Sequence, residues 1–171
     1  MRNIIAVIGL IVVLGFVNWS IIGKEQHLAE GEIVYLELAP VDPRSLMQGD
    51  YMALRFAMAN NVYEALPKSD DSNRWRQQVE APDGKVVVSV DDRKVASFRR
   101  IHDDAEVAAG DRLIKYRVRN NQVKFATNAF FFEEGQGSVY EAALYGQFRV
   151  DGDGELLLVA MYDKDLNELA P

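Results

Sequence analysis

The chain begins with a long uncharged apolar segment and continues with short stretches in which apolar and polar residues alternate. From Ile4 to Ile22 every residue is apolar or small, apart from Asn18 and Ser20. As an α-helix this segment is about 28 Å long, which matches the thickness of the hydrocarbon core of a bilayer. We therefore predict that the stretch from Ile4 to Ile22 is a transmembrane helix in contact with the lipid bilayer.

Three other interpretations of this segment are a buried helix of a soluble protein, a cleaved signal peptide and a helix lying in the membrane interface. A soluble helix would carry a polar stripe, and a signal peptide has a shorter apolar stretch that ends in small residues. Here the residues stay bulky up to Ile22, and Trp19 lies at the level of the interfacial aromatic belt. The chain then turns hydrophilic at Gly23-Lys24-Glu25-Gln26, so an uncleaved anchor agrees best with the sequence.

Few charges define the orientation of this anchor. Arg2 and the free amino group stand on one side and Lys24 on the other, so the positive-inside rule favours a cytoplasmic N-terminus. We divide the chain into an anchor with a short polar tether at residues 1–27 and a domain at residues 28–171. The expected location is the cytoplasmic (inner) membrane, with a single pass and a periplasmic or extracellular domain.

Beyond the anchor, the apolar positions recur with the two-residue period of β-strands. One face of the stretch that follows Gly49 is apolar, and we assign it to the core: Met52, Leu54, Phe56 and Met58. The predicted strands and hairpins are Gly31 to Ala39, Lys85 to Val90 with Arg93 to Ile101, Leu113 to Arg119 with Gln122 to Ala126, and Tyr145 to Val150 with Glu155 to Tyr162.

Short helices are expected in two places. The polar stretch from Asn60 to Glu80 is interpreted as an excursion with a short helix near Trp75. Ser138 and Glu141 have the spacing of a capping box, which predicts the start of a second short helix. The sequence therefore predicts a β-rich fold, mainly β or α+β, in which a small barrel or curled sheet follows the N-terminal transmembrane helix.

Composition narrows the possible functions. The 171 residues, 49% of them hydrophobic, are enough for one core beside the anchor. A net charge of −7 argues against nucleic acid or an anionic membrane surface as the partner. The sequence contains no cysteine, which excludes disulfides, zinc-thiolate sites and thiol nucleophiles.

We expect no metal site and no cofactor. His27 and His102 have no metal-ligand neighbour at a useful spacing. The run from Asp151 to Glu155 places oxygen-bearing side chains at alternate positions, as a calcium loop does, but Leu156 stands where such a loop requires glycine. A hairpin turn is the better interpretation of that run.

Candidate binding residues lie around the stretch from Gly49 to Phe56. Gly49 suits a positive φ angle and Asp50 suits a turn cap, so most of the stretch has a structural explanation. Tyr51 and Arg55 share the face opposite the core, where a phenol beside a guanidinium suits an anionic group or a carboxylate of a partner. The alternative is a surface pair without a ligand. The candidates in this region are Asp42, Arg44, Asp50, Tyr51 and Arg55.

Glu133 and Glu134 form a second candidate because they follow three phenylalanines and precede a glycine. A carboxylate that points into an apolar pocket has a raised pKa, which suits acid-base chemistry. Adjacent residues of a strand face opposite sides, so both carboxylates share a pocket only if the chain bulges. One buried glutamate, or none, is the simpler expectation.

An enzymatic alternative is a signal-peptidase-like hydrolase that uses Ser45 as nucleophile and Lys115 as its base. Such a base must be desolvated and neutral. Lys115, however, shares its strand face with Arg117 and Arg119, and a solvated face keeps the lysine protonated. The proline-threonine that follows the serine in that family is also missing from this sequence.

The stretch Gly49-Asp50-Tyr51-Met52-Ala53-Leu54-Arg55-Phe56 resembles the signature of the GDYXXLXY family of bacterial membrane-anchored proteins. Phe56 stands where the signature ends in tyrosine. Val41-Asp42-Pro43-Arg44, Phe132-Glu133-Glu134-Gly135 and Tyr140-Glu141-Ala142-Ala143 are also similar to this family, so the resemblance covers most of the domain. It implies an accessory protein that works beside a multi-pass membrane protein.

These observations lead to one preferred function and two alternatives. The preferred one is a non-catalytic, extracytoplasmic accessory domain that docks an integral membrane protein, because the anchor concentrates the domain near such partners. The first alternative is the Ser/Lys hydrolase. The second is a binding module for an anionic ligand.

Overall fold

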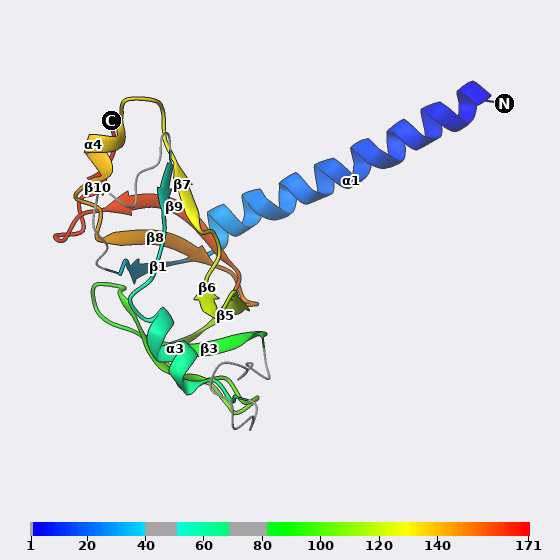
Figure 1. The fold of residues 1–171 in the computed structure, drawn as a ribbon. Helices are drawn as coiled ribbons and strands as arrows, with labels where there is room; N and C mark the ends of the chain where they lie inside the picture. Colours follow the sequence, from blue (N-terminus) through cyan, green and yellow to red (C-terminus); the bar gives the residue numbers. More distant parts are fainter. Residues whose placement is uncertain (1, 40–50, 69–81) are drawn as a thin grey trace.

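The computed structural model describes residues 2–39, 51–68 and 82–171. It consists of a long N-terminal helix, α1 (Arg2–Glu30), that projects from a β-rich domain (Figure 1). The other described elements are β1 (Glu32–Glu37), β2 (Tyr51–Ala53), α3 (Ala59–Ala65), β3 (Asp83–Val90), β4 (Ala96–Ile101), β5 (Asp111–Arg119), β6 (Gln122–Lys124), β7 (Ala129–Phe131), α4 (Gly137–Tyr140), β8 (Tyr145–Val150), β9 (Leu156–Tyr162) and β10 (Glu168–Leu169).

Within the described ranges, the strands form two curled four-stranded sheets and one two-stranded pair. The strand order is β1-β8-β9-β10 in the first sheet and β4-β3-β5-β6 in the second, and β2 pairs with β7. The sheets meet along β1, where the Tyr35 amide donates a 2.8 Å hydrogen bond to the Lys94 carbonyl. They meet again at the turn after β8, where the Lys115 amide donates to the Gly154 carbonyl at 2.8 Å. The curled sheets therefore surround a common interior.

Aromatic rings fill the centre of this interior. Phe56 packs edge-on against both Phe125 and Phe148, with ring centroids 5.7 Å apart in each pair. Phe125 and Phe148 are fully buried, and Phe56 is nearly so. Edge-to-face aromatic pairs are favourable beyond the area that they bury, so these three rings join the two sheets.

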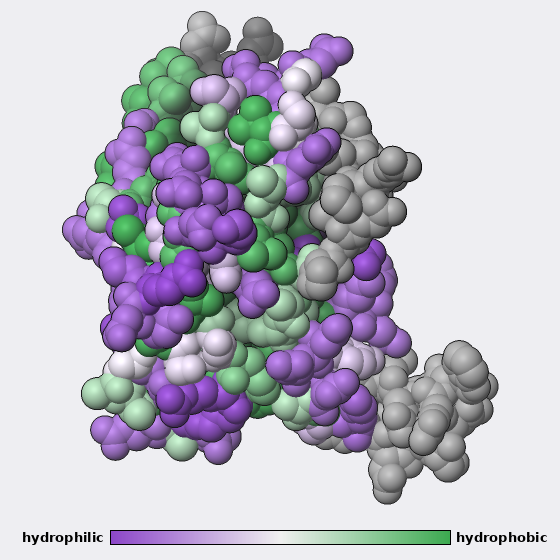
Figure 2. Space-filling model, turned by 90° about the vertical axis from the view of Figure 1, so that its left-hand side faces the viewer, coloured by the Kyte–Doolittle hydropathy of each residue, from purple (hydrophilic) through white to green (hydrophobic). Residues whose placement is uncertain are grey.

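The outer surface of the domain is more polar than its aromatic interior. Figure 2 shows the face turned away from the anchor, where hydrophilic residues cover most of the surface and hydrophobic ones form small patches between them. By contrast, α1 carries most of the strongly exposed large apolar side chains, among them Phe16 and Trp19. This distribution is typical of a membrane helix attached to a water-exposed domain.

The structure confirms the β-rich fold class and the three predicted hairpins, which are β3–β4, β5–β6 and β8–β9. It also confirms the core face from Met52 to Met58, although β2 ends at Ala53. The reason is a change of partner. β2 pairs with β7, whereas Phe56 bridges to Leu38 just beyond β1, so no single ladder continues through the stretch.

The two expected short helices have different outcomes. The helix expected near Trp75 lies outside the described residues, and the described start of the polar stretch belongs to another helix, α3, which begins at Ala59. The capping box is wrong, because α4 has Gln136 as its N-cap without a side-chain hydrogen bond, and Ser138 lies inside the helix. A backbone turn from Glu133 to Gln136 starts this helix two residues earlier than the sequence spacing suggested.

Candidate functional site

The anchor helix does not end where its apolar stretch ends. α1 is long and apolar enough to span a membrane, and it continues past Ile22 to Glu30 without a break. The residues after Ile22, which the sequence suggested as a short polar tether, are therefore helical. The domain begins directly at β1, with Gly31 between the helix and the strand.

His27 fastens the end of α1 to the first sheet. Its side chain is buried, and Nε2 lies 2.9 Å from the backbone carbonyl oxygen of Arg149 in β8. A carbonyl oxygen only accepts, so Nε2 carries the proton of this hydrogen bond. The other ring nitrogen, Nδ1, lies 3.8 Å from the Asp151 carboxylate. The imidazole is thus placed between the helix and the β8–β9 hairpin.

Gly31 allows the helix and the sheet to approach each other closely. A Cβ atom at position 31 would lie 2.5 Å from the His27 carbonyl oxygen and 2.9 Å from Cβ of Arg149. The Arg149 guanidinium in turn donates a 2.8 Å hydrogen bond to the Gly31 carbonyl. A larger residue would push these groups apart, so the sequence has glycine at the junction.

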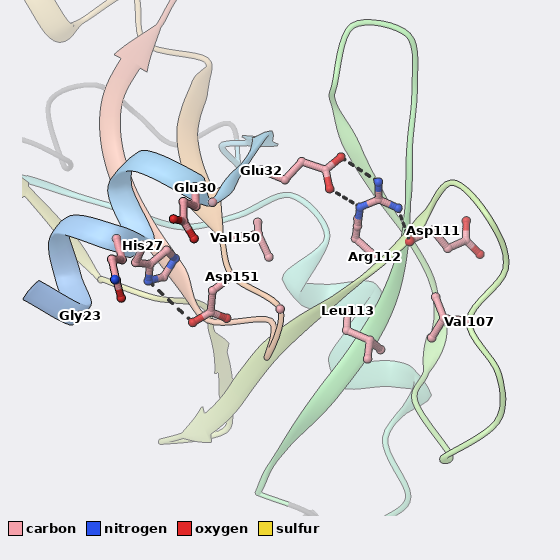
Figure 3. Close-up of a pocket in the computed structure, with 13 residues that line it drawn as sticks. Gly23, His27, Glu30, Glu32, Val107, Asp111, Arg112, Leu113, Val150 and Asp151 are labelled. Atoms are coloured by element: carbon pink, nitrogen blue, oxygen red, sulfur yellow. Dashed lines mark hydrogen bonds and ion pairs between the residues drawn. The ribbon is translucent and has the colours of Figure 1, made fainter.

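A groove of about 640 Å³ opens beside this junction (Figure 3). Arg112 of β5 crosses one side of the groove and donates two hydrogen bonds to the Glu32 carboxylate. This hydrogen-bonded partner, with the nearby negative charges of Glu32 and Asp111, raises the pKa of Arg112 above its ordinary value. The Asp111 carboxylate is itself 3.4 Å from Arg99. The main charges of the groove are therefore paired within the domain and hold β1 against β5.

A second groove, of about 400 Å³, lies on another side of the anchor, and we call it the Phe131 groove. It is bordered by Lys24 of α1, by Phe130 and Phe131 of β7, and by Leu157 and Leu158 of β9. The Phe131 side chain is 74% exposed, which is unusual for phenylalanine in a folded domain. An apolar surface thus lies directly beside Lys24, the first charged residue after the apolar stretch of α1.

The structure separates several of the residues suggested by the sequence. Tyr51 is half-buried and packs against Phe131, with ring centroids 5.7 Å apart. Arg55 is exposed and lines a different groove, together with Tyr63 and Lys124. Asp42, Arg44, Asp50 and Ser45 lie outside the described residues.

Glu133 and Glu134 are both exposed in the loop after β7. The Gln136 side chain donates a 3.1 Å hydrogen bond to the Glu133 carboxylate within this loop. The idea that one of the two carboxylates enters an apolar pocket is therefore wrong. The reason is that β7 ends at Phe131, so the chain turns toward solvent before it reaches the glutamates.

Lys115 is held by a carboxylate. Its Nζ lies 3.2 Å from Oε2 of Glu155, and both side chains are nearly half exposed. A general base of this kind has to be desolvated, and a side chain that faces both a carboxylate and water does not meet that requirement. Glu155 belongs to the β8–β9 turn, so sequence spacing gave no indication of this pair.

Sequence reasoning missed the His27 contact and the Phe131 groove. A lone histidine after an apolar segment gives no signal, because its partner Arg149 is 122 residues away. The run of three phenylalanines was noticed, but which of the rings faces solvent depends on the pairing of β7 with β2.

One family of proteins matches this chain, and two residues of its signature stretch lie in the core of the domain. A family model described as GDYXXLXY protein matches residues 13–161 of the chain. Leu54 and Phe56 of the signature stretch are both buried, and Phe56 lies among aromatic rings where the signature has tyrosine. No curated protein and no solved structure matches the chain. The match covers most of its length, and the chain therefore belongs to the GDYXXLXY family.

Proposed function

We propose that this protein is a non-catalytic accessory subunit that docks an integral membrane protein, with its domain on the outer side of the cytoplasmic membrane. The observation that carries the proposal is the position of the Phe131 groove beside Lys24. Lys24 follows Ile22 by two residues, about 3 Å along the helix, so the groove lies next to the membrane surface. A partner that fills it has to protrude only slightly from the bilayer, as the extramembrane loops of a multi-pass protein do.

The junction keeps this groove in place. A flexible tether would allow the domain to rotate freely above the membrane, whereas α1 continues to Glu30 and is fixed through His27 and Gly31. A fixed orientation reduces the entropy that is lost when the domain docks. The continuous helix therefore supports a role in which the domain presents one particular surface to a neighbour in the membrane.

The anchor itself offers a polar group for contact with another helix. Nδ2 of Asn18 donates a 2.8 Å hydrogen bond to the Leu14 carbonyl of the same helix. Asn18 is exposed on α1, and polar amides in membrane helices commonly bond across to a neighbouring helix. Asn18 thus supports a partner that is itself embedded in the membrane.

The hydrolase alternative has less support. It requires a neutral Lys115, and this lysine is paired with Glu155. The outward placement of the domain continues to rest on the positive charge of Arg2, to which the positive-inside rule applies.

Photocrosslinking in native membranes tests the docking proposal. In one full-length variant a photoreactive phenylalanine analogue replaces Phe131. In the matched control the same analogue replaces Tyr63 of α3, a helix that lies away from α1 in Figure 1. We expect the analogue at position 131 to crosslink to a multi-pass membrane protein, and the analogue at position 63 not to do so. Copurification of that protein should also weaken in a Phe131→Ser variant. Crosslinks from position 131 to lipid alone, or the same product from both positions, contradict the proposal.

A further inference from the structure

A basic groove of about 500 Å³ lies on the outer face of the second sheet. Its walls come from β3, β5, β6 and the turn before β9. Five cationic side chains line it, namely Lys85, Lys115, Arg117, Arg119 and Lys124, against the two carboxylates of Asp83 and Glu155. The groove thus has an excess of positive charge in a chain whose net charge is −7. Such local charge of the opposite sign attracts anions that the rest of the surface repels.

The strand register places like charges opposite each other in this groove. Lys85 pairs with Lys115 across β3 and β5, and Arg117 pairs with Lys124 across β5 and β6. Like charges at directly opposite positions of an antiparallel pair destabilise a sheet. Asp83 stands opposite Arg117 across β3 and β5 and offsets part of this repulsion, and an anion between the two like-charged pairs would offset more of it.

Carboxylates of the domain pair with only some of the cations in this groove. Glu155 lies 3.2 Å from Lys115, and Asp83 lies 3.0 Å from Arg119. Arg117 donates a hydrogen bond to the Ala126 carbonyl at 2.6 Å, and Asp83 stands opposite it in the register of β3 and β5. Within the described ranges, no ion pair forms at Arg117 or at the half-buried Lys85 and Lys124. Among the described residues, three of the five cations therefore lack an ion pair.

We infer that this basic groove is a binding site for a ligand that carries two or more phosphate groups. A phosphate has a higher charge than a carboxylate and three strong acceptor oxygens, so one group can contact both members of a cross-strand cationic pair. Lys115, Arg117 and Arg119 follow one another on the same strand face at intervals of about 7 Å, which suits successive charged groups of an extended ligand. The inference goes beyond the proposed docking role, because the basic groove is not the Phe131 groove.

The position of the site leaves two sources for the phosphate. The basic groove and the Phe131 groove share Ala126 and Glu155 in their walls, so the basic groove adjoins the surface beside Lys24 and the membrane. Headgroups of anionic lipids are therefore within the same region of the molecule. A soluble molecule with several phosphates is the other source, and the experiment separates the two.

The test uses the full-length protein in nanodiscs of phosphatidylcholine alone, titrated with inorganic tripolyphosphate in a calorimeter. We expect saturable binding that weakens as salt is added, because exposed charges are screened. The double variant Arg117→Gln/Lys124→Gln should weaken binding by about tenfold or more, since charged hydrogen bonds are stronger than neutral ones. Lys85→Gln, on a different strand, should weaken it in the same direction.

The matched control is Lys94→Gln/Lys164→Gln, which removes the same charge from two exposed turns outside the groove. Its affinity should equal that of the unchanged protein, and thermal unfolding shows whether each variant is folded. If the control weakens binding as much as the groove variant does, the effect is one of net charge and the inference fails.

Nanodiscs that also contain cardiolipin, an anionic lipid with two phosphate groups, distinguish the two sources. If lipid headgroups occupy the site, tripolyphosphate binds more weakly in these discs, and the amides of β5 and β6 exchange hydrogen more slowly than in phosphatidylcholine. If the ligand is soluble, the affinity for tripolyphosphate is the same in both discs. Absence of tripolyphosphate binding in neutral discs, together with unchanged exchange in anionic discs, overturns the inference. Neither result depends on capture of a membrane partner, so the docking proposal is tested separately.

Discussion

The imidazole Nε2 of His27 lies 2.9 Å from the carbonyl oxygen of Arg149, which joins the last turns of α1 to a central strand of the first sheet. The guanidinium of the same Arg149 bonds to the carbonyl of Gly31, four residues after the histidine. The contact is therefore reciprocal, and it fixes the direction of α1 relative to the domain. Much of the proposed function depends on this junction.

Replacement of His27 by alanine should loosen the junction. The variant removes the imidazole donor to the Arg149 carbonyl together with the packing of the buried ring, so we expect the free energy of unfolding to fall by about 1 to 3 kcal/mol. Hydrogen exchange at residues 24–30 should become faster at the same time. His102→Leu is the control, because Nδ1 of His102 is buried without a hydrogen-bond partner in the part of the chain that the structure describes. An equal loss in both variants contradicts a specific role for His27.

Gly31→Ala should destabilise the protein through a steric clash. The added Cβ atom meets the His27 backbone carbonyl at 2.5 Å, and backbone cannot move aside as a flexible side chain can. We expect a loss of about 1 to 3 kcal/mol, measured by chemical unfolding in detergent. Gly152→Ala is the matched control, because a Cβ atom there meets nothing within 4 Å. Stability of the Gly31 variant equal to that of the control would show that the junction is loose.

Removal of one charge from the basic groove should stabilise the domain. Lys124→Gln relieves the repulsion from Arg117 across β5 and β6, so the free energy of unfolding should rise by up to about 1 kcal/mol at low salt. The gain should decrease at high salt. Lys94→Gln is the control, because it removes the same charge from an exposed turn of an acidic chain. There we expect no rise in the free energy of unfolding. A decrease in stability for Lys124→Gln would mean that this cation is compensated within the domain.

Tyr162 gives a prediction about alkaline pH. Burial, followed by the neighbouring Tyr35 and Glu168, raises the pKa of Tyr162 from 10.0 to about 12. The folded state therefore holds this proton more tightly than the unfolded state, and the resulting stability is present below pH 10 and is lost as the pH rises from 10 to about 12. Tyrosinate absorbance should show the late titration, and Tyr162→Phe should reduce it, leaving the contribution of Tyr116, whose pKa burial also raises. Titration of all tyrosines near pH 10 would contradict the buried environment.

The orientation of the domain can be measured directly, because the chain has no native cysteine. Lys164→Cys places a thiol in an exposed turn of the domain, and Asn3→Cys places one before the membrane span. A maleimide that does not cross membranes should label the first variant in intact spheroplasts and the second only after lysis. The reverse result would place the domain in the cytoplasm.

The sequence alone determined the features that depend on local order along the chain. The uncharged stretch from Ile4 to Ile22 gave a helix that is long and apolar enough to span a bilayer, since length and polarity decide that property. The alternation around Met52 and Phe56 gave the core face, because successive side chains of an extended chain point to opposite sides. Turn residues between apolar runs, such as those from Asp151 to Gly154, gave the three hairpins.

The tertiary structure decided which distant residues meet. Lys124 and Lys85 enter the basic groove from strands on either side of β5, and only the pairing register shows that each faces a second cation. Glu155 reaches Lys115, and His27 reaches Arg149, through contacts that no spacing along the chain encodes. The physical reason is that local periodicity fixes the direction of a side chain relative to its own strand or helix, whereas its neighbours depend on how the sheets curl and close around the common core.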